Sequence, residues 1–169
     1  TGHILGLPDL YAYHGAGPHR FVGVWDLMGN IFSSTDYSAW HRLKLGWLDA
    51  SQWTCAKPTG ITQTTLTPLG ISGGRKGIFI RTSNTTALVI ENRQKVGNDT
   101  GICRQGILVS SINAAVDTGV GPVRVLGGTT AGCGYGVRSD APLKLGQKLV
   151  VGRTTIQVVG ASGRNRTVK

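Results

Sequence analysis

The sequence predicts a mainly β protein: an antiparallel sandwich or barrel-like domain preceded by a small helix-and-loop region. From about residue 62 onward, apolar and polar residues alternate with the period of two that strands require. Gly-rich turns such as Gly73-Gly74 and Gly127-Gly128 separate these short runs. Short strands at this spacing are typical of sandwiches and barrels.

The first fifty residues have a different character. Residues 1–6 resemble the last turns of a helix that Gly6 ends, and residues 10–35 predict a packed loop. Residues 36–46 predict one complete helix, with Asp36 or Ser38 as its N-cap and Gly46 as its stop. We therefore expect an N-terminal region over 1–51 and a β-rich domain over 52–169.

The β-rich domain is expected to be built from short strands rich in Val, Ile and Thr. Residues 151–154 predict a hairpin turn between the last two of these strands. The predicted strands span residues 61–67, 77–81, 87–93, 106–112, 123–126, 148–151 and 155–159.

Charge is unevenly distributed in this chain of 169 residues with a net charge of +10. Residues 1–50 hold three Lys and Arg against four Asp, a net −1, and residues 51–169 hold fifteen against four, a net +11. The cations are spread singly, which argues against a nucleic-acid partner. No apolar run approaches the ~18 residues of a membrane-spanning helix, and no signal or transit peptide is evident, as expected for a mature or trimmed product.

Three cysteines, an odd number, occur at Cys55, Cys103 and Cys133. Cys103 and Cys133 bracket one block of predicted strands and are the preferred disulfide pair. Cys55 is then free or paired with a segment outside this chain. No Cys-x-x-Cys or Cys/His spacing of a structural zinc site is present.

The chemistry-bearing pattern is His3-x-x-Gly6-x-x-Asp9. It matches the second half of HExxHxxGxxD, in which two His on one helical face bind zinc and a Glu activates the metal-bound water. Gly6 would let the chain turn back, so that Asp9 could supply a third ligand. A His satisfied by structural contacts is the alternative reading of His3. Met28, in Trp25–Gly29, has the form of a tight turn that places a Met beneath a metal, and core packing is its alternative.

Four blocks together resemble the immune inhibitor A family of secreted bacterial zinc metalloproteases, which are metzincin-like. The resemblance implies that His3 is the second zinc His, Asp9 the third ligand, Gly6 the turn Gly and Met28 the Met of the Met-turn. It also implies that residues 1–51 are the C-terminal part of a catalytic domain. The blocks are HILGLPDLY (3–11), VGVWDLMG (22–29), SAWHRLKLGWL (38–48) and ENRQKVGNDTGICRQG (91–106).

The sequence departs from this family in lacking the first zinc His and the catalytic Glu, because its single Glu is Glu91. Metzincins place a Tyr shortly after the Met, where this chain has Asn30, so no transition-state Tyr is assigned. We therefore expect a fragment of a secreted zinc endopeptidase that acts on proteins or peptides through metal-activated water. On its own, without the N-terminal part of the catalytic domain, it is expected to be inactive.

For the other polar residues, the sequence favours structural roles over functional ones. His14 could approach the metal but reads as a surface-loop residue, and His41 as packed or solvated. Glu91 and Arg93 alternate on a strand and predict an ion pair or a loop-fixing hydrogen bond. Asp99 reads as a turn residue, and a calcium site there is left open.

Two other functions compete with the peptidase hypothesis. The first is a non-catalytic β-sandwich module that serves in binding or as a structural remnant. The second is a basic β domain that binds an anionic polymer, which the +11 charge of residues 51–169 suggests.

Overall fold

A computed structural model describes residues 2–33, 35–57, 59–129, 133 and 136–169 of the chain. The described part is mainly β, with nine strands in two sheets, one short α-helix and three 3₁₀ turns. The strands are β1 (Trp53–Ala56), β2 (Thr64–Leu66), β3 (Gly77–Arg81), β4 (Thr86–Arg93), β5 (Gly106–Asn113), β6 (Val123–Val125), β7 (Lys148–Val151), β8 (Thr154–Ser162) and β9 (Asn165–Val168). The helices are η1 (Gly2–Leu5), α1 (Ala39–Lys44), η2 (Ala50–Gln52) and η3 (Gly97–Gly101).

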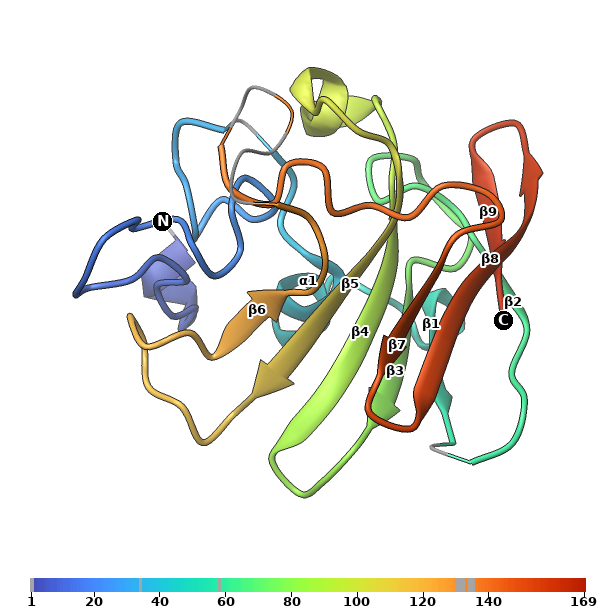
Figure 1. The fold of residues 1–169 in the computed structure, drawn as a ribbon, viewed down its shortest axis with the longest axis horizontal. Helices are drawn as coiled ribbons and strands as arrows, with labels where there is room; N and C mark the ends of the chain where they lie inside the picture. Colours follow the sequence, from blue (N-terminus) through green and yellow to red (C-terminus); the bar gives the residue numbers. More distant parts are fainter. Residues whose placement is uncertain (1, 34, 58, 130–132, 134–135) are drawn as a thin grey trace.

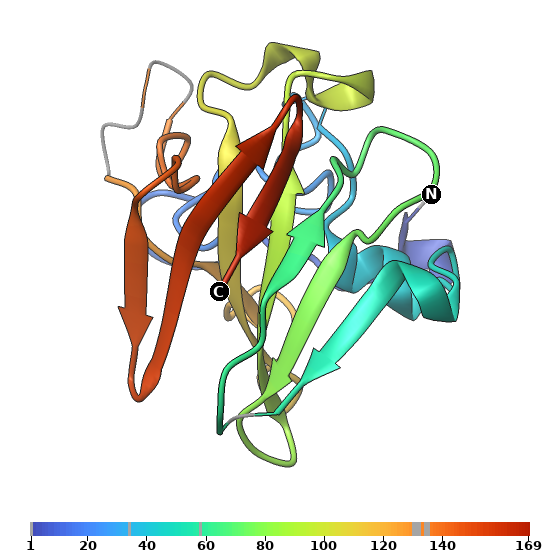
Figure 2. The same cartoon turned by 90° about the vertical axis from the view of Figure 1, so that its right-hand side faces the viewer.

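The strands form a five-stranded sheet in the order β1-β3-β4-β5-β6 and a four-stranded sheet in the order β2-β9-β8-β7 (Figure 1). Strands β1 and β3 pair in parallel, and the other pairs are antiparallel. The two sheets stack face to face, as Figure 2 shows, and are not closed into a barrel. We call the two sheets together the sandwich.

The five-stranded sheet is the middle layer of the molecule. Along β5, Ile107 and Val109 pack in the core between the two sheets, whereas Leu108 faces the opposite way. Because a strand covered on both faces has no polar side, β3, β4 and β5 are buried along most of their length. Their outer face is covered by residues 2–33 and 35–51, which we call the N-terminal segment.

The N-terminal segment has little regular structure and ends its two helices on glycines. After η1, Gly6 adopts a φ of +78°, Leu7 N donates to Gly2 O, and Gly6 N donates to His3 O. After α1, Gly46 has a φ of +69°, and Trp47 N donates to Arg42 O. Both endings are Schellman motifs, which need a residue free to adopt positive φ.

The predicted mainly β fold with few helices after residue 52 is confirmed. The spans 77–81 and 148–151 match β3 and β7, the hairpin at 151–154 joins β7 to β8, and Ser38 caps α1. The expected helix over 36–46 is shorter, and β1 and β9 were not predicted. The expectation of purely antiparallel pairing is wrong for β1 and β3.

The boundary near residue 51 stays a prediction. One hydrophobic cluster contains residues from both sides of it, such as Trp25 and Met28 with Val89 and Leu108. A second cluster lies between the two sheets and draws on residues after 52. In the described part of the chain, no helix is long and apolar enough to cross a membrane.

The predicted disulfide between Cys103 and Cys133 is confirmed, with Cα atoms 6.1 Å apart. It joins the end of η3 to the chain that follows β6. Cys55, on β1, is exposed and free.

Candidate functional site

The η1 turn and the chain reversal after it bring His3 and Asp9 together. The Nε2 atom of His3 lies 3.0 Å from Oδ1 of Asp9, and its Nδ1 atom lies 3.1 Å from Leu7 O. A carbonyl oxygen can only accept, so Nδ1 carries a proton and donates to Leu7. The contact thus places the second ring nitrogen, Nε2, directly against a carboxylate oxygen.

Neighbouring hydroxyl groups hold Asp9 in place. Tyr13 Oη donates to Asp9 Oδ2 at 2.6 Å, and the backbone N–H of Asp9 donates to Thr118 Oγ1 at 2.8 Å. The Asp9 carboxylate is mostly buried, with a side chain 14% exposed, whereas the His3 side chain is 60% exposed. His3 is thus accessible from solvent, while Asp9 is held by Tyr13 and Thr118.

Met28 packs directly against the η1 turn. A Cβ atom at Gly2 would lie only 2.4 Å from Met28 Sδ, so the close approach depends on glycine at position 2. A tight turn holds Met28, since Asp26 Oδ1 accepts from Met28 N and Asp26 O accepts from Gly29 N. The expected turn is therefore present, and Met28 is packed against the backbone of the segment that carries His3.

A cavity of about 520 Å³ opens beside these residues. His3, Asp9 and Met28 line it together with three residues that we did not predict at the site: Tyr11, His19 and Tyr37. His19 Nδ1 contacts Gly29 O at 2.8 Å, which ties the wall of the cavity to the turn that carries Met28. Burial and the nearby Asp26 carboxylate raise the pKa of Tyr37, which keeps its phenol protonated.

Asn30, expected in place of a Tyr, also lines the cavity. Its side chain is occupied locally, because Oδ1 accepts from Phe32 N at 3.0 Å. The phenol of Tyr37 approaches instead from seven residues further along the chain. The sequence spacing after Met28 does not predict Tyr37 at the cavity, because its approach depends on the path of the loop 30–33.

The remaining histidines lie away from this pair. His14 is exposed in a loop where its carbonyl accepts from Arg20, and it does not line the cavity. His41 is fully buried, as the packed alternative predicted, with Nδ1 2.9 Å from Asp26 Oδ2. That contact lacks the alignment of a good hydrogen bond, and Nε2 of His41 has no partner among the described residues.

Asp26 accepts from two backbone N–H groups besides facing His41. Burial alone would raise its pKa, but His41 and the N–H groups of Ser38 and Met28 lower the pKa below its ordinary value. Asp26 is therefore an ionised structural carboxylate that organises the chain between Met28 and α1.

Glu91 and Arg93 form the predicted ion pair, in the interior. Arg93 Nη1 lies 2.9 Å from Glu91 Oε1, and both side chains are at most 2% exposed. Burial raises the pKa of Glu91, against the opposing effects of Arg93 and of the N–H of Ala39. For Arg93, burial acts to lower the pKa, but Asp99 and Glu91 outweigh it and raise the pKa.

Asp99 is buried, although the other residues of the η3 turn are exposed. Its two carboxylate oxygens accept from Arg93 Nε and Nη2 at 2.7 and 2.6 Å, and Oδ1 also accepts from Asp36 N. Because the guanidinium already occupies both oxygens, Asp99 has no free oxygen facing a calcium ion in this arrangement.

The residues at His3 and Asp9 fit zinc only in part. An imidazole and a carboxylate are accepted zinc ligands at about 2.0–2.2 Å, and two atoms 3.0 Å apart can approach one ion. Across the described ranges, however, no group of three or more His, Cys, Asp or Glu side chains is arranged to hold a metal. The described residues thus bring together at most two side chains, His3 and Asp9, where a catalytic zinc needs three protein ligands.

Comparison with known proteins gives no further identification. No protein-family model, curated protein or solved structure matches this chain.

Proposed function

We propose that this chain is part of a secreted zinc-dependent endopeptidase and that it is inactive on its own. The carrying observation is the His3–Asp9 contact, at a solvent-open cavity and against Met28. The resemblance in the four sequence blocks supports the same assignment. The Cys103–Cys133 disulfide is compatible with an extracellular location.

The residues at the candidate site have distinct roles in the proposal. His3 and Asp9 would be two zinc ligands, and Tyr13 keeps the Asp9 carboxylate oriented through its 2.6 Å hydrogen bond. Met28 supports the η1 turn from beneath. Bound zinc would supply an activated water and would polarise the peptide carbonyl.

The lack of activity follows from where the single Glu lies. Glu91 is 2% exposed and bonded to Arg93 and to the backbone N–H of Ala39. It therefore cannot reach water at His3 as a general base. Loss of a positioned base commonly costs ~10²–10⁴-fold in rate, and a two-ligand site is also expected to hold zinc weakly.

The competing proposal, a non-catalytic β-sandwich module, also has an observation in its favour. The core between the sheets is formed by side chains after residue 52, such as Ile90, Val109 and Val158. A sandwich with its own core could serve in binding, including binding of anionic polymers, without any contribution from His3 or Asp9.

Zinc titration calorimetry on the purified chain tests the metal site. We expect weak zinc binding that His3→Ala abolishes, whereas His14→Ala, which changes an exposed loop His outside the cavity, leaves it unchanged. Equal binding by the two variants would remove His3 from the site and favour the non-catalytic module.

A peptidase assay tests the expected inactivity. The chain with added zinc is incubated with a denatured protein, with and without chelator, and we expect no turnover above background. Chelator-sensitive turnover at ordinary protease rates would mean that another residue replaces the missing base.

A further inference from the structure

The interior of the sandwich contains a slot that is unrelated to His3 and Asp9. It has a volume of about 320 Å³ and lies where residues 57 and 60–62 and the β7–β8 hairpin meet the two sheets. This volume is at the lower end of the range for small-molecule sites. The slot is partly open to solvent.

The floor of the slot is apolar and comes from both sheets. Ile78, Ile80 and Ile90 line it from the five-stranded sheet, and Ile156 and Val168 line it from the four-stranded sheet. All five belong to the core between the sheets. An occupant of the slot would thus be in contact with branched aliphatic side chains on two sides.

The mouth of the slot is cationic. Lys57, Arg153 and Lys169 line it, with neutral Thr and Gln side chains beside them, and none of the described lining residues is Asp or Glu. Residues 141–169 contain six Lys and Arg and no acidic residue. The three cations are exposed, so they are free to meet a ligand from solvent.

We propose that this slot binds a single-chain anionic amphiphile, with its aliphatic chain between the sheets and its carboxylate at Lys57, Arg153 and Lys169. The apolar floor selects the chain through burial of methylene groups. The cations and the absence of acidic lining residues select the sign of the head group. Neither feature alone specifies both ends of such a ligand, whereas their arrangement in one slot does.

Calorimetric titration of the full chain with dodecanoate, below its micelle concentration, tests the proposal. We expect saturable 1:1 binding, with affinity rising about fourfold for each methylene added from octanoate until the slot is filled. Butyrate, which has the head group without the chain, and dodecyltrimethylammonium, which has the opposite charge, should not bind measurably.

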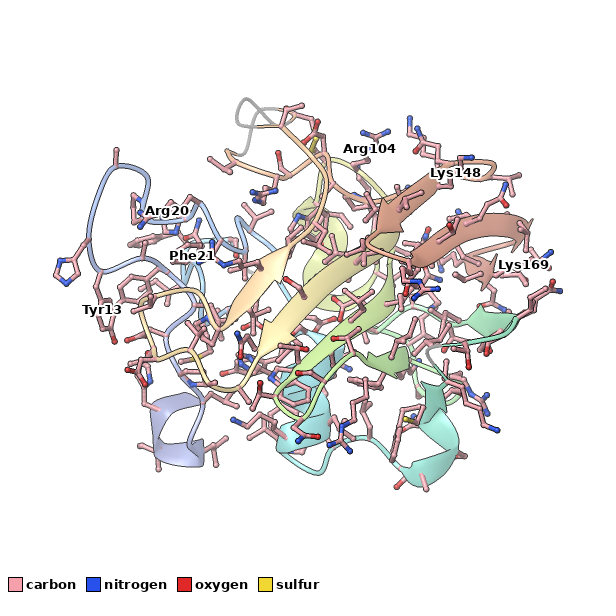
Figure 3. The ribbon with its side chains drawn as sticks, turned by 60° about the horizontal axis from the view of Figure 1, so that its bottom comes forward. Tyr13, Arg20, Phe21, Arg104, Lys148 and Lys169 are labelled. Carbon is pink, nitrogen blue, oxygen red and sulfur yellow. A yellow bond between two sulfur atoms is a disulfide. The ribbon has the colours of Figure 1, made fainter. Side chains whose placement is uncertain are left out.

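Two Lys variants form a matched pair for locating the head group. Lys169 lines the slot, whereas Lys148, on the edge strand β7 of the same sheet, is exposed and does not, and Figure 3 labels both on the same side of the molecule. Lys169→Glu should weaken dodecanoate binding roughly three- to tenfold, and Lys148→Glu should leave it within experimental error.

Several results would overturn the proposal. These are the absence of saturable dodecanoate binding, equal binding of the cationic amphiphile, and equal weakening by the two Lys variants. Titration with inorganic polyphosphate is a further part of the experiment. If it binds in a manner that depends on Lys169 while dodecanoate does not bind, the cations serve an anionic polymer instead. None of these results depends on zinc, so they leave the peptidase proposal untouched.

Discussion

The two faces of the five-stranded sheet are held by different kinds of interaction. Toward the four-stranded sheet, buried aliphatic residues such as Ile90 and Val109 interlock with Ile156 and Val158. Toward the N-terminal segment, the sheet also presents a buried charged group, Arg93, with Glu91 beside it. Toward the four-stranded sheet the contacts are mainly apolar, although buried Asn92 also donates to Leu66 O and Arg164 O, whereas the other face depends on a network of buried charges.

The difference reflects how the four-stranded sheet and the N-terminal segment each satisfy the hydrogen-bonding groups of their own backbone. Strands of the four-stranded sheet bond to one another, but the N-terminal segment has few ladder or helix partners, and its buried N–H and C=O groups need side chains. Arg93 donates to Trp25 O and Asp36 O, Glu91 accepts from Ala39 N, and Asp99 accepts from Asp36 N. Buried charge here replaces secondary structure as the means of fixing a loop.

The largest effect is expected from Arg93→Met. This change leaves Glu91 and Asp99 as buried carboxylates without their cation and should lower the free energy of unfolding by about 3–5 kcal/mol. Urea denaturation of the variant measures the loss. Arg81→Met, which removes an exposed cation at the end of β3, should change stability by less than about 0.5 kcal/mol. Similar losses for the two variants would contradict the comparison of the two faces.

The second effect concerns the disulfide, which lies close to the N-terminal segment. Chain-entropy arguments for a 30-residue separation give about 3–4 kcal/mol of stabilisation, and the double variant Cys103→Ser/Cys133→Ser should lose this amount. Trp25 donates from Nε1 to Arg138 O, just beyond Cys133. We therefore expect Trp25 fluorescence to respond. Replacement of the free thiol by Cys55→Ser is the control, and an equal loss there would sink the interpretation.

Much of the sandwich was predictable because its signals are local. Val, Ile and Thr runs with Gly-rich turns located β3, β4, β5 and β7 to within a residue at each end. Strand β1 was missed because WTCA is too short to show a period, and its parallel partner β3 begins 21 residues after β1 ends. Strand β9 was missed because Arg and Asn dominate it and only Val168 reaches the core.

The sequence predicted only those parts of the candidate site whose residues are close together in the sequence. The six-residue spacing of His3 and Asp9 and the turn at Met28 could be read directly from the sequence. Tyr13, His19 and Tyr37 could not, since their approach depends on loops whose shape is set by distant partners such as Thr118 and Gly29. The charges of Glu91 and Arg93 indicated a pair, but their burial follows from the N-terminal segment that covers them.

The smallest effect expected at pH 7 concerns Lys76, whose pKa is influenced by a charged residue of the N-terminal segment. Its ammonium is buried and donates to Thr67, Pro68 and Ile71. Burial, with a smaller contribution from Arg42 of α1, lowers the pKa of Lys76 to about 8. Between pH 8 and its unfolded value near 10.5, the unfolded chain binds more protons than the folded one, so this group makes stability rise with pH.

Comparison of the native chain with Lys76→Met isolates that contribution from other titrating groups. At pH 7 the variant should be about 1–3 kcal/mol less stable, because three acceptors lose their donor. The difference should then widen as pH rises from 8 to 10.5, while the exposed control Lys44→Met shows no such trend. Arg42→Met should move the onset of this rise to higher pH, since it removes the neighbouring cation but leaves the burial. A difference between native chain and Lys76→Met that stays flat with pH would mean that Lys76 titrates as it does in solvent, and that charge in the N-terminal segment does not reach the sandwich.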